Sequence, residues 1–94
     1  MAVGVLMDFE GATLDQYDQV VQTMGLTPGG PMPVGGISHW VTKTDDGFRV
    51  TDVWESREQF EQFAAEQIGP AAADAGPAPP QPTFHEAHNY FING

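Results

Sequence analysis

The stretch "GFRVTDVWES", residues 47–56, decides how the chain is expected to fold. Successive side chains of a β-strand point to opposite faces of a sheet, and this stretch alternates accordingly. One face carries Phe48, Val50, Asp52 and Trp54. A carboxylate therefore shares a mainly apolar face with an indole. Ser56 can cap a following helix, with Gln59 at the capping-box position. The stretch predicts a strand that leads directly into a helix and carries one unusual acidic residue.

The residues before this stretch predict a strand and a helix. Residues 3–10 alternate, but both alternating sets are mostly apolar, which indicates a central strand covered on both faces. Thr13 and Gln16 form a capping-box pattern, and Gly25 occupies the position of a C-terminal helix cap. Between them, apolar side chains recur at helical spacing: Leu14, Tyr17, Val20, Val21 and Met24.

The remaining segments predict a loop, two more strands and a second helix. Residues 27–36 are rich in Gly and Pro and favour a loop. Residues 37–44 predict a strand that turns through "DDG" into the opening stretch. The helix after Ser56 has an apolar stripe of Phe60, Phe63, Ala64 and Ile68. Pro70 interrupts it or starts a further turn, which can extend to Gly76. Residues 77–82 predict a stiff linker, and residues 83–92 predict the last strand.

The predicted order of elements is strand, helix, strand, strand, helix, strand. This order is typical of an α+β, ferredoxin-like βαββαβ fold with a four-stranded antiparallel sheet, here a single domain over residues 1–94. Two helices can cover only one face of such a sheet. The other face still carries apolar residues, so we expect a second copy of the chain to cover it. The prediction is a homodimer in which two sheets pack as an α/β barrel.

Charge and composition restrict the partners. The 94 residues include 13 acidic residues, three Lys or Arg and no Cys, which gives a net charge of −10. Such a charge repels nucleic-acid phosphates and anionic membranes, so neither is an expected partner. A neutral organic ligand is not repelled by this charge and is therefore a more plausible partner. The sequence contains no run of 18 apolar residues, and the start "MAVGVLMDFE" has no basic segment or cleavage site. The expected location is therefore the cytoplasm.

Four segments together resemble a known family. "YDQVVQTMGL", "PVGGISHWV", "DDGFRVTDVWESREQFEQF" and "HEAHNYF" are similar to small dimeric α/β-barrel proteins, including the antibiotic-biosynthesis-monooxygenase-like and stress-responsive groups. The resemblance covers nearly the whole chain and implies a dimer with a pocket between sheet and helices. The family includes cofactor-free quinone-forming oxygenases, polyketide cyclases and haem degraders, so the resemblance selects no single reaction.

The residue that faces Asp52 depends on the hairpin turn. With a two-residue turn at Asp46-Gly47, His39 faces Trp54 and is a diagonal neighbour of Asp52. A carboxylate beside an imidazole fixes its tautomer and raises its basicity. In an apolar pocket, this pair would suit proton abstraction from a phenol or a 1,3-dicarbonyl.

A second turn gives a different neighbour. A type I turn over residues 44–47, followed by a bulge at Gly47, places Trp40 opposite Asp52. This turn is slightly favoured because type I accepts Asp at both central positions. The carboxylate would then accept a hydrogen bond from the indole N–H or from a backbone donor, or would cap structure at the edge of the core.

Seven residues are candidates for the site. His39 is the candidate base, Asp52 its orienting group and Tyr17 a hydrogen-bond donor, although each could instead serve the core. The predicted ligand-binding residues are Trp40, Trp54, Phe60 and His88. The two tryptophans could equally fill the core or the dimer interface.

No cofactor is expected. His85 and His88 lie on opposite faces of a strand, so they cannot share one metal within that strand. A site built from His39, His88 and a carboxylate is a minor alternative. Haem propionates need cations, and the chain has three Lys or Arg in all. No nucleophile elbow, phosphate-binding glycine pattern or calcium loop is present.

The resulting hypothesis is a small-molecule-binding protein of secondary metabolism. It would be a cofactor-independent monooxygenase-like or cyclase-like enzyme that acts on a neutral, partly aromatic or polyketide-type metabolite. The alternative is a non-catalytic ligand-binding or stress-responsive dimeric module, which the small supply of reactive side chains favours.

Overall fold

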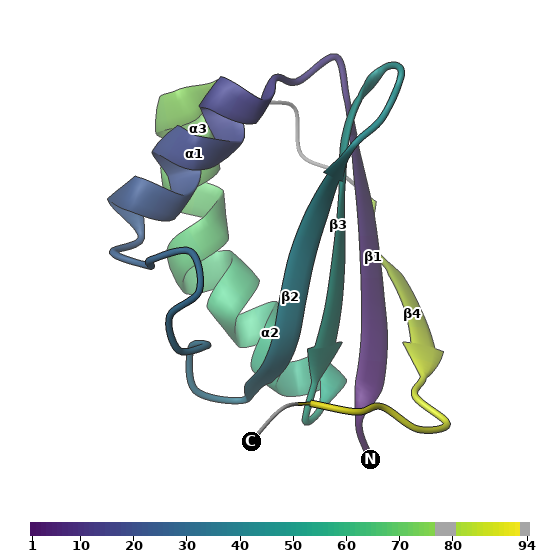
Figure 1. The fold of residues 1–94 in the computed structure, drawn as a ribbon. Helices are drawn as coiled ribbons and strands as arrows, with labels where there is room; N and C mark the ends of the chain where they lie inside the picture. The colour runs from purple at the N-terminus through teal and green to yellow at the C-terminus, as the bar shows by residue number, and fades with distance from the viewer. Residues whose placement is uncertain (77–80, 93–94) are drawn as a thin grey trace.

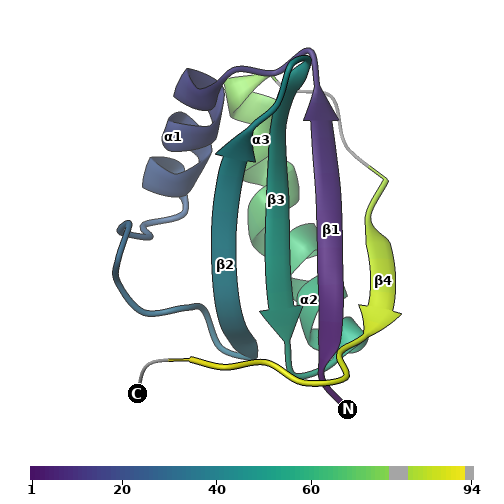
Figure 2. The same cartoon turned by 45° about the vertical axis from the view of Figure 1, so that its right-hand side comes forward.

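The computed structural model describes residues 1–76 and 81–92. Within these ranges four strands form one antiparallel sheet in the order β2-β3-β1-β4, and the helices lie together on one of its faces (Figures 1 and 2). The elements are β1 (Val3–Glu10), α1 (Leu14–Thr23), β2 (Gly36–Lys43), β3 (Gly47–Trp54), α2 (Arg57–Phe63), the π-helical η1 (Ala64–Ile68), α3 (Gly69–Ala75) and β4 (Thr83–Glu86). The predicted α+β, ferredoxin-like fold is confirmed.

Both predicted helix starts are confirmed by their caps. The backbone N–H of Gln16 donates to the Thr13 hydroxyl at 3.1 Å, and the Gln16 side chain accepts from the Thr13 N–H at 2.9 Å. At the second helix, the Gln59 N–H donates to the Ser56 hydroxyl at 3.2 Å. These bonds satisfy N–H groups that have no partner within the helix, so they fix where each helix begins.

The second helix passes Pro70 without a break. The widened π-helical turn η1 separates α2 from α3, and Pro70 stands at the start of α3. A proline lacks the N–H of a regular helical bond, and a π-turn just before it accommodates that loss. The helix ends where predicted, at Gly76, whose φ of 98° lies in the left-handed region.

The last strand is shorter than predicted. β4 covers only Thr83–Glu86, whereas the sequence pattern favoured residues 83–92. Glu86 already pairs with Val3, the first residue of β1, so the residues beyond it have almost no strand left to pair with. One further bond joins the Ala87 N–H to the Ala2 carbonyl at 3.0 Å. Residues 77–80 of the predicted linker lie outside the described residues.

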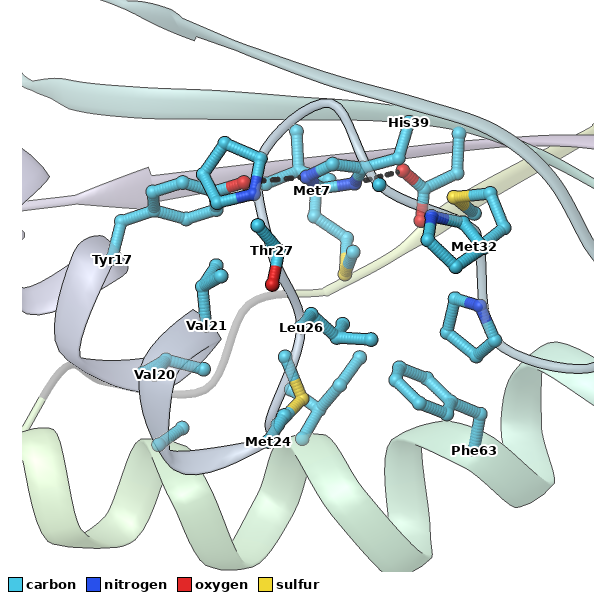
Figure 3. Close-up of a pocket in the computed structure, with 18 of the residues that line it drawn as sticks. Met7, Tyr17, Val20, Val21, Met24, Leu26, Thr27, Met32, His39 and Phe63 are labelled. Carbon is cyan, nitrogen blue, oxygen red and sulfur yellow. Dashed lines mark hydrogen bonds and ion pairs between the residues drawn. The ribbon is translucent and has the colours of Figure 1, made fainter.

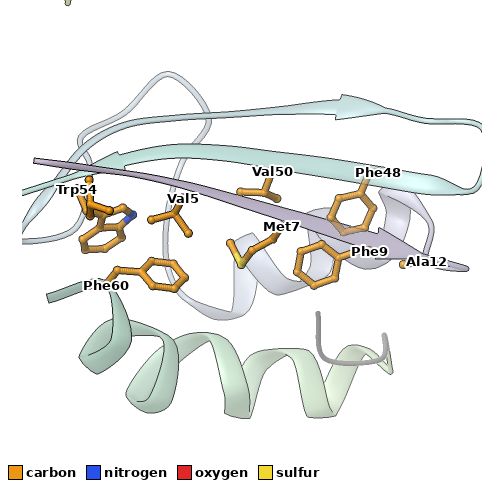
Figure 4. Close-up of a cluster of buried hydrophobic side chains, with 9 residues drawn as sticks. Val5, Met7, Phe9, Ala12, Phe48, Val50, Trp54 and Phe60 are labelled. Carbon is orange, nitrogen blue, oxygen red and sulfur yellow. The ribbon is translucent and has the colours of Figure 1, made fainter. Parts of the chain in front are cut away.

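The core lies between the inner face of the sheet and the long second helix (Figure 4). Its buried side chains from β1, β3 and α2 include stacked Phe9 and Phe48, with ring centroids 4.7 Å apart. Trp54 meets Phe60 edge to face at 5.6 Å. The opposite face of β1 is only half covered, because Gly4 and Leu6 remain partly exposed. The expectation that both faces of β1 are covered is therefore not met within one chain.

No helix among the described residues is both long enough and apolar enough to span a membrane.

Replacing Gly47 by Ala should destabilise the fold. A Cβ at Gly47 would overlap the carbonyl oxygen of Phe9, where β1 and β3 approach closely. Overpacking of this kind typically costs about 1–3 kcal/mol, which urea unfolding would measure. Gly4→Ala is the matched control, because its Cβ would stand 3.6 Å from the nearest atom, an ordinary contact. Equal unfolding free energies for the two variants would contradict the close approach.

Candidate functional site

A cavity of about 160 Å³ lies between the sheet, α1, the loop after α1 and the second helix (Figure 3). Its presence explains an unusual feature of α1. The helix has an apolar stripe, yet none of its residues is buried. Tyr17, Val20, Val21 and Met24 line the cavity. Tyr17 also meets the sheet, because its hydroxyl bonds to His39 and its ring lies edge to face with Phe48, with centroids 5.4 Å apart. The first helix therefore covers the cavity, and its apolar side chains are only partly buried.

The β2–β3 hairpin determines which residues meet at the cavity. His39 lies directly opposite Asp52, and Lys43 lies opposite Phe48. The Thr44 N–H donates to the Gly47 carbonyl at 3.0 Å, so only Asp45 and Asp46 form the turn.

Both predicted registers are therefore wrong. Both placed Gly47 in the turn or in a bulge beside it, but Gly47 is the first residue of β3 and its φ is not positive. Gly47 is required instead for its close approach to Phe9. The actual register differs from the favoured one by one residue. Since the side-chain period of a strand is two, this shift exchanges Trp40 for His39 opposite Asp52.

A chain of hydrogen bonds joins three elements at the cavity (Figure 3). The His39 Nδ1 lies 2.6 Å from Asp52 Oδ1, and His39 Nε2 lies 2.6 Å from the Tyr17 hydroxyl. The carboxylate accepts the proton on Nδ1, so Nε2 is left as an acceptor for the tyrosine O–H. The second carboxylate oxygen, Oδ2, accepts the indole N–H of Trp54 at 3.1 Å.

The exposure of these groups changes along the chain of bonds. Asp52 is 4% exposed, whereas the His39 side chain is 32% exposed. A buried carboxylate is tolerated when both oxygens have donors, and the N–H groups of His39 and Trp54 provide them. This arrangement explains why an aspartate lies on the apolar face of β3. Asp52 holds the imidazole of His39 in one orientation and one tautomer. The Nε2 atom is the one able to take a proton.

The pKa of Tyr17 is raised above its ordinary value. Burial is the main cause, followed by the negative charges of Asp52 and Asp18. All three effects disfavour the tyrosinate, so Tyr17 stands at the cavity as a neutral hydroxyl that donates a hydrogen bond.

Four of the predicted site residues come together, and three do not. Tyr17, His39, Asp52 and Trp54 all line the cavity. Trp40 pairs with Thr51 on the opposite face of the sheet and is 55% exposed. Phe60 is 1% exposed and packs in the core behind Trp54. His88 follows β4 and is exposed. None of these three residues lines the cavity, because each lies on another surface or in another layer.

The described residues contain no group of three or more His, Asp or Glu side chains that could hold a metal ion. His39, His88 and a carboxylate are therefore not among such groups in the described part of the chain, and the metal site considered from the sequence is not formed.

The loop after α1 contributes a cavity wall that the sequence pattern did not predict. Residues 26–33 form one wall of the cavity, with three prolines and Met32 among them. The glycine pair that follows permits tight packing. At Gly36 an added Cβ would stand 2.5 Å from the Met32 side chain, and Gly35 has a φ of 89°. The composition indicated only a loop, although prolines placed between glycines also fit a wall of fixed shape.

No protein-family model matches the sequence, and the curated protein sequences show no match to it. Solved structures do show similarity. A protein of Chloroflexus aurantiacus, provisionally assigned as an antibiotic biosynthesis monooxygenase, is 18% identical over 100% of both chains, with a TM-score of 0.67. SnoaB, a cofactor-independent oxygenase from Streptomyces nogalater, is 14% identical over 98% of this chain and 97% of its own, with a TM-score of 0.60.

A third similar structure was solved with a ligand. The monooxygenase from the gene ActVA-Orf6 of Streptomyces coelicolor, in complex with Nanaomycin D, is 18% identical, with a TM-score of 0.56. The matched region is 99% of this chain and 92% of that one. At these identities the similarity establishes a shared fold. The predicted resemblance to the antibiotic biosynthesis monooxygenases is thus confirmed for the fold.

Removing the charge of Asp52 should lower the pKa of Tyr17. The chain has two tyrosines, so a Tyr90→Phe background isolates Tyr17 in a phenolate absorbance titration. Adding Asp52→Asn should bring the pKa of Tyr17 nearer to that of free tyrosine, because one cause of its rise is removed. Asp15→Asn, at an exposed position in the first turn of α1, is the control. An unchanged Tyr17 pKa in the Asp52 variant would contradict the network.

The same pKa shift predicts a pH dependence of stability. The folded-state pKa of Tyr17 is the higher one, so its contribution is fully present below the unfolded-state value of about 10. The contribution is lost as the pH rises through the folded-state pKa.

Proposed function

We propose that this protein is a cofactor-independent, monooxygenase-like enzyme that acts on a neutral, partly aromatic molecule carrying an acidic hydroxyl group. One observation carries the proposal: the Asp52–His39–Tyr17 chain of hydrogen bonds ends at an apolar cavity. His39 is the base, Asp52 orients it, and Tyr17 donates a hydrogen bond to a substrate oxygen. The oxygenases with the same fold support the reaction class, although they are only distantly similar.

The proposed reaction starts with proton transfer. The substrate hydroxyl takes the place of the Tyr17 hydroxyl at His39 Nε2, and the imidazole removes its proton. Asp52 stabilises the imidazolium that forms. Loss of this proton converts the substrate into an electron-rich anion. A cyclase-like enzyme would use the same first step and then form a carbon–carbon bond.

In the oxygenase reaction, this anion reacts directly with O₂. One oxygen atom becomes a new carbonyl on a ring carbon. The other leaves as water with two hydrogens, one from the substrate hydroxyl and one from that carbon. The substrate thus loses four electrons and O₂ gains them, so O₂ is the only co-reactant that the step needs.

One observation favours the alternative of a non-catalytic binding module. The Tyr17 hydroxyl already bonds to His39 Nε2 at 2.6 Å. The imidazole is therefore not free to accept a substrate proton until a ligand displaces the tyrosine hydroxyl. A binding module would keep this bond and use the cavity alone. Oxygen uptake distinguishes the two functions, because only the enzyme consumes O₂.

We further propose the predicted homodimer. The outer face of the sheet carries Leu6 and Val53, both half-buried, and Trp40, which is 55% exposed. Leu6 and Trp40 both pair with Thr51, so they lie in one row across the sheet. A large exposed indole on the same sheet face as other apolar side chains is typical of a surface covered by another chain. A second copy packed through this face would leave the cavity under the helices of each subunit.

His39→Ala should remove most of the activity. Loss of a general base typically lowers the rate roughly 10²–10⁴-fold. The measurement is oxygen consumption and quinone formation with a panel of neutral hydroxyarenes and 1,3-dicarbonyl compounds. His85→Ala is the control, because His85 is exposed on β4 and lies outside the cavity. Unchanged turnover by the His39 variant on a substrate of the wild-type protein would refute the assigned base.

Trp40→Glu should convert the dimer to a monomer. Sedimentation equilibrium of the wild-type protein at micromolar concentration should give twice the mass of one chain. A carboxylate in place of the exposed indole is costly to bury against a second chain, so the variant should dissociate. Leu14→Glu, a charge added at a partly exposed position on α1, should remain dimeric. A folded wild-type monomer, or dissociation of both variants alike, would exclude this interface.

A further inference from the structure

The size of the cavity restricts its ligand more than the fold does. Its volume is about 160 Å³. An engineered apolar cavity of about 150 Å³ in another protein binds benzene, whereas sites for drug-sized ligands begin at roughly 300 Å³. The cavity therefore accepts one six-membered ring with a small substituent, and it is too small for a fused ring system.

Most polar groups of the cavity gather at one end, and the hydroxyl of Thr27 on the loop wall lies apart from them (Figure 3). The Tyr17 hydroxyl and the His39 imidazole lie beside the sheet, while Met24, Leu26 and Phe63 stand away from them (Figure 3). Asp52 also lines this polar end, but both of its oxygens already accept N–H groups. A matching ligand carries one hydroxyl group at one edge and is apolar elsewhere.

The cavity also selects against charge. Asp52 is the only charged side chain among the described residues that line it, and no Lys or Arg is among them. A ligand carboxylate would have no cation to meet and would stand near Asp52. We infer that the ligand of this site is a neutral phenol with a single ring, its hydroxyl at His39 Nε2 and its ring among the apolar side chains. The inference rests on the proposed function, since it places the ligand at the proposed base.

One wall of the cavity sets the size limit. Met24, Leu26, Pro33 and Phe63 line the cavity on one side and a surface groove of about 430 Å³ on the other. Gln59 and Gln62 of the second helix line that groove only. A wall one side chain thick thus separates the two spaces, and shortening Met24 should extend the cavity toward the groove.

Calorimetric titration under nitrogen tests the inference without turnover. The probes are p-cresol, its anionic analogue p-hydroxybenzoate, naphthol and anthrol. The wild-type protein should bind p-cresol about tenfold or more tightly than each of the other three, because an added ring overpacks the cavity and a carboxylate lacks a partner. Met24→Ala should bring naphthol to within about threefold of p-cresol. Leu14→Ala, which changes the same helix outside the cavity, should keep the wild-type order.

The outcomes separate this inference from the proposed function. Preferential binding of anthrol or p-hydroxybenzoate by the wild-type protein, or no binding of p-cresol, would overturn the inference. If circular dichroism shows that Met24→Ala does not fold, Leu26→Ala opens the same wall and replaces it. Oxygen uptake with the bound phenol is measured separately. Tight p-cresol binding without oxygen uptake on any hydroxyarene of the panel would overturn the oxygenase proposal and leave the ligand class standing.

Discussion

The buried Asp52 carboxylate is the interaction on which the site depends. Removing a carboxylate from water without partners is strongly unfavourable, so its position fixes the groups around it. One oxygen is held by His39 of β2 and the other by Trp54 of its own strand. Through the imidazole, the same carboxylate is linked to Tyr17 of α1. A single acidic residue thus couples the edge strand, the central strand and the first helix.

The hollow beneath α1 is the second unusual feature of this small domain. A chain of this size has little apolar surface to spare for its core. The side chains under α1 nevertheless leave a cavity of about 160 Å³ beside the buried Asp52 and do not fill that space. A ligand that fits the cavity would explain why this apolar surface is not packed into the core.

The fold was largely predictable from local patterns, and the site only in part. The caps at Thr13 and Ser56 and the alternation of β3 depend on neighbouring residues alone. Whether His39 meets Asp52 depends on the hairpin register, which the close approach of Gly47 to another strand helps to set. That contact is long-range and leaves no local signal. The short β4 and the wall formed by the loop after α1 likewise depend on where other segments end.

The chemistry of this protein is therefore better argued from its site than from its fold. Structures with the same fold are at most 18% identical among those compared, so a shared architecture transfers no particular side chain. Tyr17, His39 and Asp52 come from three separate elements, and each element has independent reasons for its position: a helix cap, a two-residue turn and a buried central strand. Three unrelated constraints converge on one line of hydrogen bonds. That line ends at Asp52, the only charged group among the described residues that line the cavity. Packing alone does not require that convergence, whereas the proposed role of His39 as a base in a defined tautomer does.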